Sequence, residues 1–73
     1  MNDSATVRAA FATRLKEERV RSGFLKPSDL AEALEMDEVR YTRWERGEVD
    51  PGLGNLVRIC KVLKITPNDL LGF

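Results

Sequence analysis

Glycine and proline residues divide this chain of 73 residues into short segments whose apolar residues recur at helical spacing. The first segment runs from about Ser4 to Ser22, and its apolar positions follow the i, i+3, i+4 rule for one buried helix face. These positions are Val7, Ala10, Phe11 and Leu15. Gly23 suits the left-handed position that commonly follows a helix. We therefore predict an amphipathic first helix that ends just before Gly23.

Apolar residues at helical spacing and residues typical of helix ends predict four further helices. Pro27 suits the first turn of a second helix, and Asp37 and Gly47 fit the beginning and the end of a third. An apolar fourth helix follows Pro51, and residues 66–67 begin a short fifth. We expect an all-α fold, a compact five-helix bundle around a single core. Its core residues share one helical phase: Phe11, Leu15, Leu30, Ala31, Leu34, Tyr41, Trp44, Leu56, Ile59, Leu63 and Leu70.

Composition limits the classes of protein to which the chain can belong. One cysteine rules out an intrachain disulfide, and the lack of histidine excludes a histidine metal site or general base. No stretch approaches the ~18 apolar residues of a membrane span, and the N-terminus lacks the regions of a signal peptide. We expect one cytoplasmic domain over residues 1–73, with no metal, no cofactor, no small-molecule ligand and no membrane contact. No cluster of nucleophile, base and oxyanion donors indicates an enzyme.

A short connection between the second and third predicted helices indicates a function. The third helix, at about 38–46, follows after about three residues, a spacing that lets such a helix lie in a DNA major groove. At about 100° per residue, its two sides differ in character. The inner side holds Tyr41, Trp44 and Glu45, and the outer side holds Val39, Arg43 and Arg46. Arginine commonly reads guanine, so the outer side fits either DNA reading or a solvated charged surface.

Several motifs before and after this unit carry a resemblance to a known family. They are Leu30-Ala31-Glu32-Ala33-Leu34, Trp44-Glu45-Arg46-Gly47, Pro51, Leu56-Val57-Arg58-Ile59-Cys60-Lys61-Val62-Leu63 and Asp69-Leu70-Leu71-Gly72. In this order they resemble the Cro/lambda-repressor family, also called the XRE family, over about residues 11–72. The resemblance implies a lambda-repressor-like five-helix DNA-binding domain whose second and third helices form the helix-turn-helix. It also implies a bacterial or phage homodimer that binds double-stranded DNA at palindromic operators.

The resemblance also implies roles for individual residues. Base contacts are expected from Glu38, Val39, Thr42 and Arg43. Phosphate contacts are expected from Lys26, Ser28, Arg40 and Arg46. Arg19 and Glu45 match a structural ion pair between the first and third helices. Four positions depart from the family pattern: Glu35 replaces the turn glycine, Pro27 a phosphate-binding glutamine, and Glu48 and Asp50 lie in a loop that is often basic.

These observations predict a sequence-specific DNA-binding transcriptional regulator, a repressor that inserts its third helix into the major groove. The alternative is a helix-turn-helix fold used as a protein-interaction module with weak or no DNA binding. Twelve basic and twelve acidic residues give zero net charge, which favours the alternative. Arg58, Lys61 and Lys64 fit a solvated face, and Cys60 fits a small core residue. Leu71 and Phe73 either cover the core or form a dimer contact.

Overall fold

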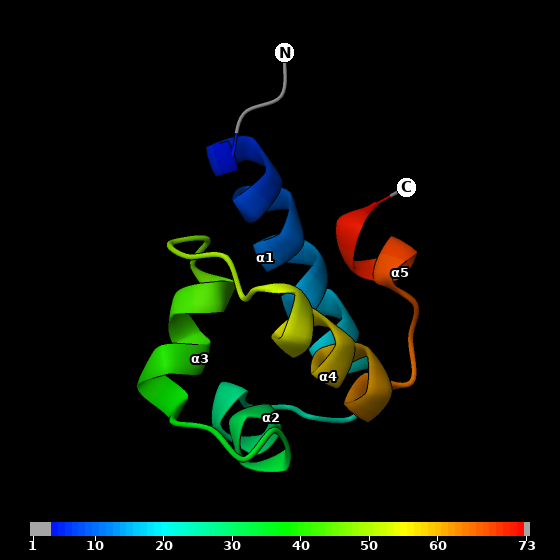
Figure 1. Cartoon of the computed structure of the whole chain (residues 1–73). Helices are drawn as coiled ribbons and strands as arrows, with labels where there is room; N and C mark the ends of the chain where they lie inside the picture. Colours follow the sequence, from blue (N-terminus) through cyan, green and yellow to red (C-terminus); the bar gives the residue numbers. More distant parts are fainter. Residues whose placement is uncertain (1–3, 73) are drawn as a thin grey trace.

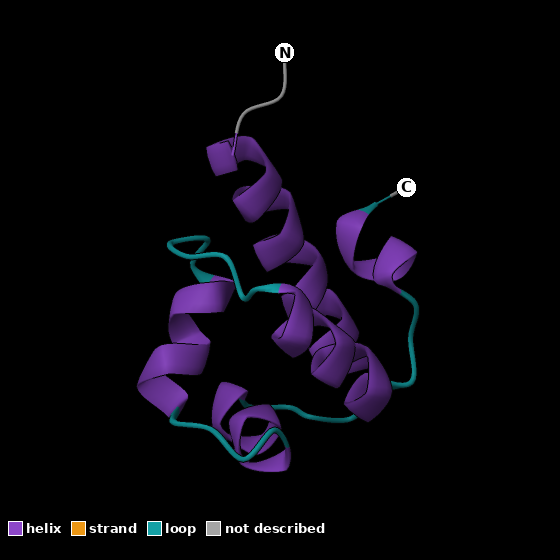
Figure 2. Cartoon of the chain, viewed as in Figure 1, coloured by secondary structure: helices purple, strands orange, loops and turns teal. Residues whose placement is uncertain are grey.

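The computed structural model describes residues 4–72, which form five α-helices and contain no strand (Figure 1, Figure 2). The helices are α1 (Ser4–Arg21), α2 (Pro27–Ala33), α3 (Glu38–Glu45), α4 (Leu53–Leu63) and α5 (Pro67–Leu71). The predicted all-α fold and the order of its helices are thereby confirmed. Two helices end one residue earlier than the sequence suggested, α1 at Arg21 and α3 at Glu45.

The longest helix, α1, lies between two of the shorter ones. It packs against α3 and α5, while α2 packs against α3 and α4 against α5. Figure 1 shows α3 and α5 on opposite sides of α1, with α2 at the bottom of the view. Isolated helices shorter than about 12–15 residues are marginal in water, so α2 to α5 depend on this mutual packing.

Side-chain caps and left-handed residues define the helix ends. The Asp37 carboxylate accepts a hydrogen bond from the Arg40 backbone N–H at 3.1 Å, which fixes the start of α3. Thr66 and Asp69 exchange backbone and side-chain hydrogen bonds in a capping box at the start of α5. Gly47, with φ 72°, ends α3 at the position predicted for it.

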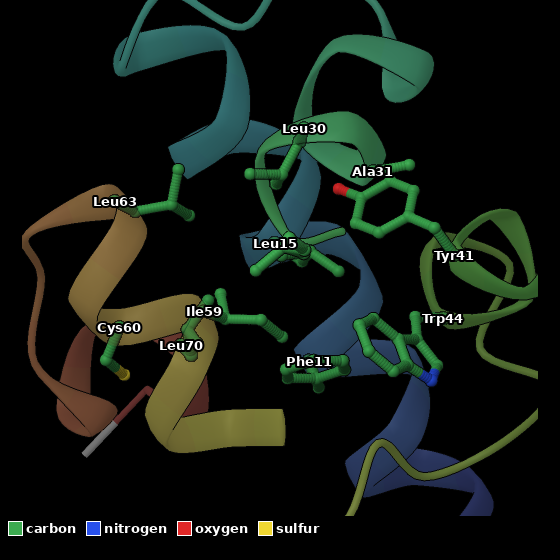
Figure 3. Close-up of a cluster of buried hydrophobic side chains, with 11 residues drawn as sticks. Phe11, Leu15, Leu30, Ala31, Tyr41, Trp44, Ile59, Cys60, Leu63 and Leu70 are labelled. Carbon is green, nitrogen blue, oxygen red and sulfur yellow. The ribbon is translucent and has the colours of Figure 1, made fainter. Parts of the chain in front are cut away.

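One apolar core joins all five helices. It contains every predicted core residue except Leu56, and it also contains Cys60. Figure 3 shows Leu15 of α1 near the middle, with side chains from α2, α3 and α4 around it. Leu56 is only half-buried at the edge of this core. Burial raises the pKa of the Cys60 thiol, as suits a small core residue.

The buried face of α1 is shorter than its apolar spacing predicts. Val7 is 43 % exposed and Ala10 is also exposed, whereas Phe11, Ala12 and Leu15 are buried. The N-terminal end of α1 extends beyond the other helices in Figure 1, and the segments around it leave Val7 and Ala10 open to solvent. The prediction that Val7 and Ala10 belong to the buried face was therefore wrong. Leu71 is half-buried against the core, and Phe73 lies outside the described residues.

The turn between α2 and α3 contains a glutamate in the left-handed conformation. Glu35 has φ 56°. Its N–H donates to the Glu32 carbonyl and the Met36 N–H donates to the Ala31 carbonyl, both at 3.0 Å. These two bonds form a Schellman motif, in which glycine is the usual left-handed residue. Any residue with a Cβ costs about 1–2 kcal/mol in that conformation.

We expect Glu35→Gly to stabilise the protein by roughly 0.5–1 kcal/mol, because relief of the left-handed strain exceeds the entropic cost of glycine. For a domain of this size the gain corresponds to a rise in Tm of a few degrees, roughly 2–8 °C. Thermal unfolding followed by circular dichroism measures it. Glu35→Ala is the matched control, since alanine keeps the Cβ and should leave Tm near that of the wild type. A lower Tm for the glycine variant would contradict the assignment of strain to this turn.

Candidate nucleic-acid interface

The helix-turn-helix unit consists of α2, residues 34–37 and α3. The turn reverses the chain so that α3 packs against both α2 and α1. Two aromatic residues of α3, Tyr41 and Trp44, are buried on its inner side with ring centroids 5.9 Å apart in an edge-to-face arrangement. The opposite side of α3 is open to solvent. One helix thus presents two chemically distinct faces.

A buried ion pair joins α1 to the inner side of α3. The Arg19 Nε lies 2.7 Å from Glu45 Oε2, and the Arg19 Nη2 lies 3.5 Å from Glu45 Oε1. The two side chains are only 4 % and 9 % exposed. The structure therefore brings together the two residues that the sequence assigns to a structural pair, in a bidentate geometry that restricts their relative orientation.

The ion pair belongs to a larger polar network. Arg19 Nη1 donates to the Phe24 carbonyl at 2.8 Å, so the same guanidinium holds the segment that leads into α2. The Tyr41 hydroxyl donates to Glu45 Oε2. Burial and the Glu45 carboxylate raise the pKa of Tyr41 well above its usual value of about 10. Sequence reasoning placed Tyr41 only at a buried apolar position and missed its hydroxyl contact.

Of the residues predicted to contact bases, Val39 and Arg43 lie on the outer side of α3, Thr42 lies at the margin of that side, and Glu38 lies in the first turn. Glu38 and Arg43 are exposed, Val39 is 69 % exposed and Thr42 is half-buried. The Thr42 hydroxyl donates to the Glu38 carbonyl at 2.8 Å, one turn back in the same helix. Thr42 therefore uses its only proton within α3 and presents its methyl group and oxygen lone pairs outward.

The residues predicted to contact phosphates lie at the start of α2 and along α3. Lys26 is the exposed N-cap residue of α2, and Ser28 is half-buried in its first turn. Arg40 is exposed in the first half of α3, and Arg46 follows its last residue with a side chain 67 % exposed. Ser28 and Arg40 belong to the helix-turn-helix unit, and Lys26 and Arg46 directly flank it.

Acidic side chains lie among these cations. Arg46 Nη1 is 3.9 Å from the Glu48 carboxylate. The Asp29 carboxylate accepts the Lys26 backbone N–H at 3.1 Å in the first turn of α2. Glu38 lies exposed at the start of α3. A polyanion that contacts Arg46 must therefore compete with Glu48 for it, at a small cost because exposed pairs are weak.

Two arginines outside the predicted site hold the unit in place. Arg58 of α4 donates to the carbonyl of Leu34, the C-cap residue of α2, and to Asn55 Oδ1 at 3.3 Å. Arg8 Nε of α1 donates to the Gly47 carbonyl just after α3 at 3.3 Å. The sequence suggested only a solvated face for Arg58. The spacing of residues within one helix cannot predict these contacts, because the two residues of each contact lie far apart in the sequence.

The described part of the chain contains neither a candidate metal site nor a candidate membrane span. Within residues 4–72, no group of cysteine, aspartate and glutamate side chains is arranged to hold a metal ion. No helix in the same range is long and apolar enough to cross a membrane.

A family profile described as a helix-turn-helix domain matches residues 10–71 of the chain. No curated protein and no solved structure matches it. The matched range contains α2, α3, α4 and α5 and most of α1. It also contains Arg19, Glu45 and Tyr41, the residues whose side chains fix α3.

We expect Glu45→Gln to lower the free energy of unfolding by about 3–5 kcal/mol, because it leaves the buried Arg19 charge unpaired. Chemical denaturation followed by Trp44 fluorescence measures the loss. Glu48→Gln removes the same charge from the exposed pair with Arg46 and serves as the control, with an expected change below about 1 kcal/mol. Equal stability of the two variants would show that the buried pair is not structural.

The high pKa of Tyr41 predicts a loss of stability at alkaline pH. The unfolded chain releases the Tyr41 proton near pH 10, whereas the folded protein retains it to higher pH. Stability is therefore full below about pH 10 and falls as the pH rises above it. Because the chain has one tyrosine, phenolate absorbance reports Tyr41 alone. We expect that absorbance to rise together with the loss of helical circular dichroism; a titration near pH 10 with the helices intact would contradict the burial.

Proposed function

Because this chain belongs to the helix-turn-helix domain family, we propose that it is a sequence-specific DNA-binding regulator of transcription. It acts as a cytoplasmic repressor, without catalysis or cofactor, by inserting α3 into the major groove of a palindromic operator. Two copies bind, one at each half-site. The family match agrees with the resemblance to the Cro/lambda-repressor family.

The two-sided character of α3 carries this proposal. Its inner side is held by the Arg19–Glu45 pair and by Trp44, and its outer side is exposed. A helix that enters a groove must present its reading side chains at a fixed angle, and a helix already fixed on its scaffold loses less entropy on binding. The buried network supplies that fixed angle, and the exposed face supplies the groups that read.

Arg43 is the proposed base reader. It is exposed in the last turn of α3, opposite the buried side, and arginine makes bidentate hydrogen bonds to guanine O6 and N7. Glu38 accepts from cytosine N4 at the N-terminal end of the helix. Val39 and the Thr42 methyl group contact thymine methyl groups, since the Thr42 hydroxyl donates within the helix.

Arg40, Arg46, Lys26 and Ser28 are the proposed phosphate contacts. Contacts to phosphates orient a protein on the duplex and carry no sequence information of their own. The exposed positions of Arg40 and Arg46 near the margins and end of α3 support this division of roles.

A protein-interaction module without DNA binding is the second candidate. The Arg46–Glu48 contact and the exposed Glu38 support it, because they reduce positive charge where a phosphate backbone would lie. Heparin chromatography separates the two candidates. A DNA-binding face elutes only at raised salt, whereas a module that binds protein elutes without retention.

The decisive experiment compares Arg43→Ala with Arg46→Ala on a site selected from randomised DNA and on scrambled DNA, over a salt series. We expect Arg43→Ala to cost about 1–3 kcal/mol on the selected site and to relax the preference at one base pair of each half-site. We expect Arg46→Ala to weaken binding to both DNAs alike and to flatten the salt dependence, because it removes a backbone contact.

Three outcomes test the parts of the proposal separately. Equal losses on both DNAs for Arg43→Ala would eliminate it as a base reader. A selected site without two half-sites about one helical turn apart, roughly 34 Å, would contradict the dimer. Wild-type protein that binds no DNA at low salt would leave the protein-interaction module as the function.

A further inference from the structure

An apolar groove of about 270 Å³ lies between the first half of α1, the start of α4 and the end of α5. Its apolar lining consists of Val7, Phe11, Pro51, Leu53, Leu56 and Leu71. Leu53 is 83 % exposed, an unusual exposure for a leucine that begins a helix beside the core. Arg8 and Asp50 are the charged residues that line the groove.

We propose that this groove is the surface through which two copies of this chain contact each other. The inference rests on the proposed binding of two copies to one operator and assigns the residues of their contact. Leu53 and Leu71 of each copy pack against the other copy, and Arg8 of each copy pairs with Asp50 of the other. The contact places Leu71 in an interface between copies, one of the two roles that its sequence position allows.

Self-complementary charge favours a second copy over an unrelated partner. In a two-fold interface the same patch meets itself, so each charge in the patch must find its opposite in that patch. The groove contains one cation, Arg8, and one anion, Asp50, around an apolar surface. Within residues 4–72 the Asp50 carboxylate forms no ion pair. Two copies related by a two-fold axis satisfy both charges twice.

The position of the groove is compatible with DNA binding. Its lining residues come from α1, α4, α5 and the loop before α4, and none comes from α2 or α3. A copy seated on the groove therefore leaves the outer side of α3 free. Arg8 also donates to the Gly47 carbonyl just after α3, so the contact between copies lies next to the end of the reading helix.

The size of the groove predicts a weak contact in the absence of DNA. Nine residues line it, whereas a stable interface uses about 20–30 residues on each side. Two copies that occupy adjacent half-sites are held at a high effective concentration, which lets a weak contact form. The contact should therefore appear as cooperativity on DNA with two half-sites.

Charge reversal tests this contact directly. The affinity of each protein for DNA with two half-sites is compared with its own affinity for DNA with one, which gives the cooperativity. We expect Arg8→Glu and Asp50→Arg, each alone, to lower the cooperativity at least about tenfold, because each brings two pairs of like charges together. An equal mixture of the two variants should restore it, since the glutamate introduced in one chain then faces the arginine introduced in the other. The mixture distinguishes a contact between copies from any effect on folding.

Two aspartate substitutions test the apolar part of the groove. Leu53→Asp should abolish cooperativity and keep binding to one half-site, because Leu53 is exposed and its loss leaves the core intact. Val20→Asp is the matched control, since Val20 is 47 % exposed on α1 and does not line the groove. It should leave the cooperativity unchanged.

Several results would overturn the interface. One is a wild type that binds two half-sites without cooperativity, and another is a Leu53→Asp variant that keeps its cooperativity. Rescue by both reversals in one chain, without rescue by the mixture, would show that Arg8 and Asp50 pair within one chain. If the wild type binds no half-site, the proposed function fails, and sedimentation equilibrium of the two mixed variants at high concentration decides the interface alone. Association of the mixture supports it, and monomers overturn it.

Discussion

The Arg19 guanidinium is the group on which the position of α3 depends. It contacts the Glu45 carboxylate of α3 and the Phe24 carbonyl that precedes α2, from a place on α1 that is almost closed to solvent. A buried charge without its partners costs several kcal/mol. If α3 or the segment before α2 separated from α1, Arg19 would lose a partner and the protein would lose stability. Tyr41 strengthens the arrangement because its hydroxyl donates to the same carboxylate. Buried contacts thus fix the orientation of α3, the helix proposed to read DNA.

The fold was largely predictable because its signals are local. Helix starts depend on a cap or a proline, as at Asp37 and Pro27, and helix ends on a residue that tolerates a left-handed backbone. Helical spacing alone predicted most of the core residues. The errors occur where burial depends on how the helices pack. Val7 has the phase of a buried residue but lines an open groove and stays partly exposed, and Leu56 reaches only the edge of the core. The helical spacing of apolar residues predicts which side of the helix a residue faces. It does not predict whether another helix covers that side.

The sequence predicted which residues of the candidate site are exposed, but it predicted few of the polar contacts around them. Helical phase separates the outer Arg43 from the inner Trp44, and the family resemblance paired Arg19 with Glu45. Polar contacts between distant segments have no such signal. The bonds from Arg58 to the end of α2 and from Arg8 to the end of α3 follow only from the packed structure. Net charge was equally uninformative, because what matters to a polyanion is where the cations lie among their acidic neighbours.

The division of α3 into two faces has a consequence for how this protein can change over generations. All interactions that hold the helix on its scaffold use its inner residues, its cap and its end, whereas Val39 and Arg43 have no part in the core. Substitutions at those outer positions are therefore nearly free of cost to folding, since surface changes shift stability by only about 0.5 kcal/mol. With α3 as the proposed reading helix, lineages of such a protein can exchange outer side chains, and with them their DNA targets, while the scaffold stays the same. The proposed recognition and the stability of the fold thus depend on different positions of a single eight-residue helix.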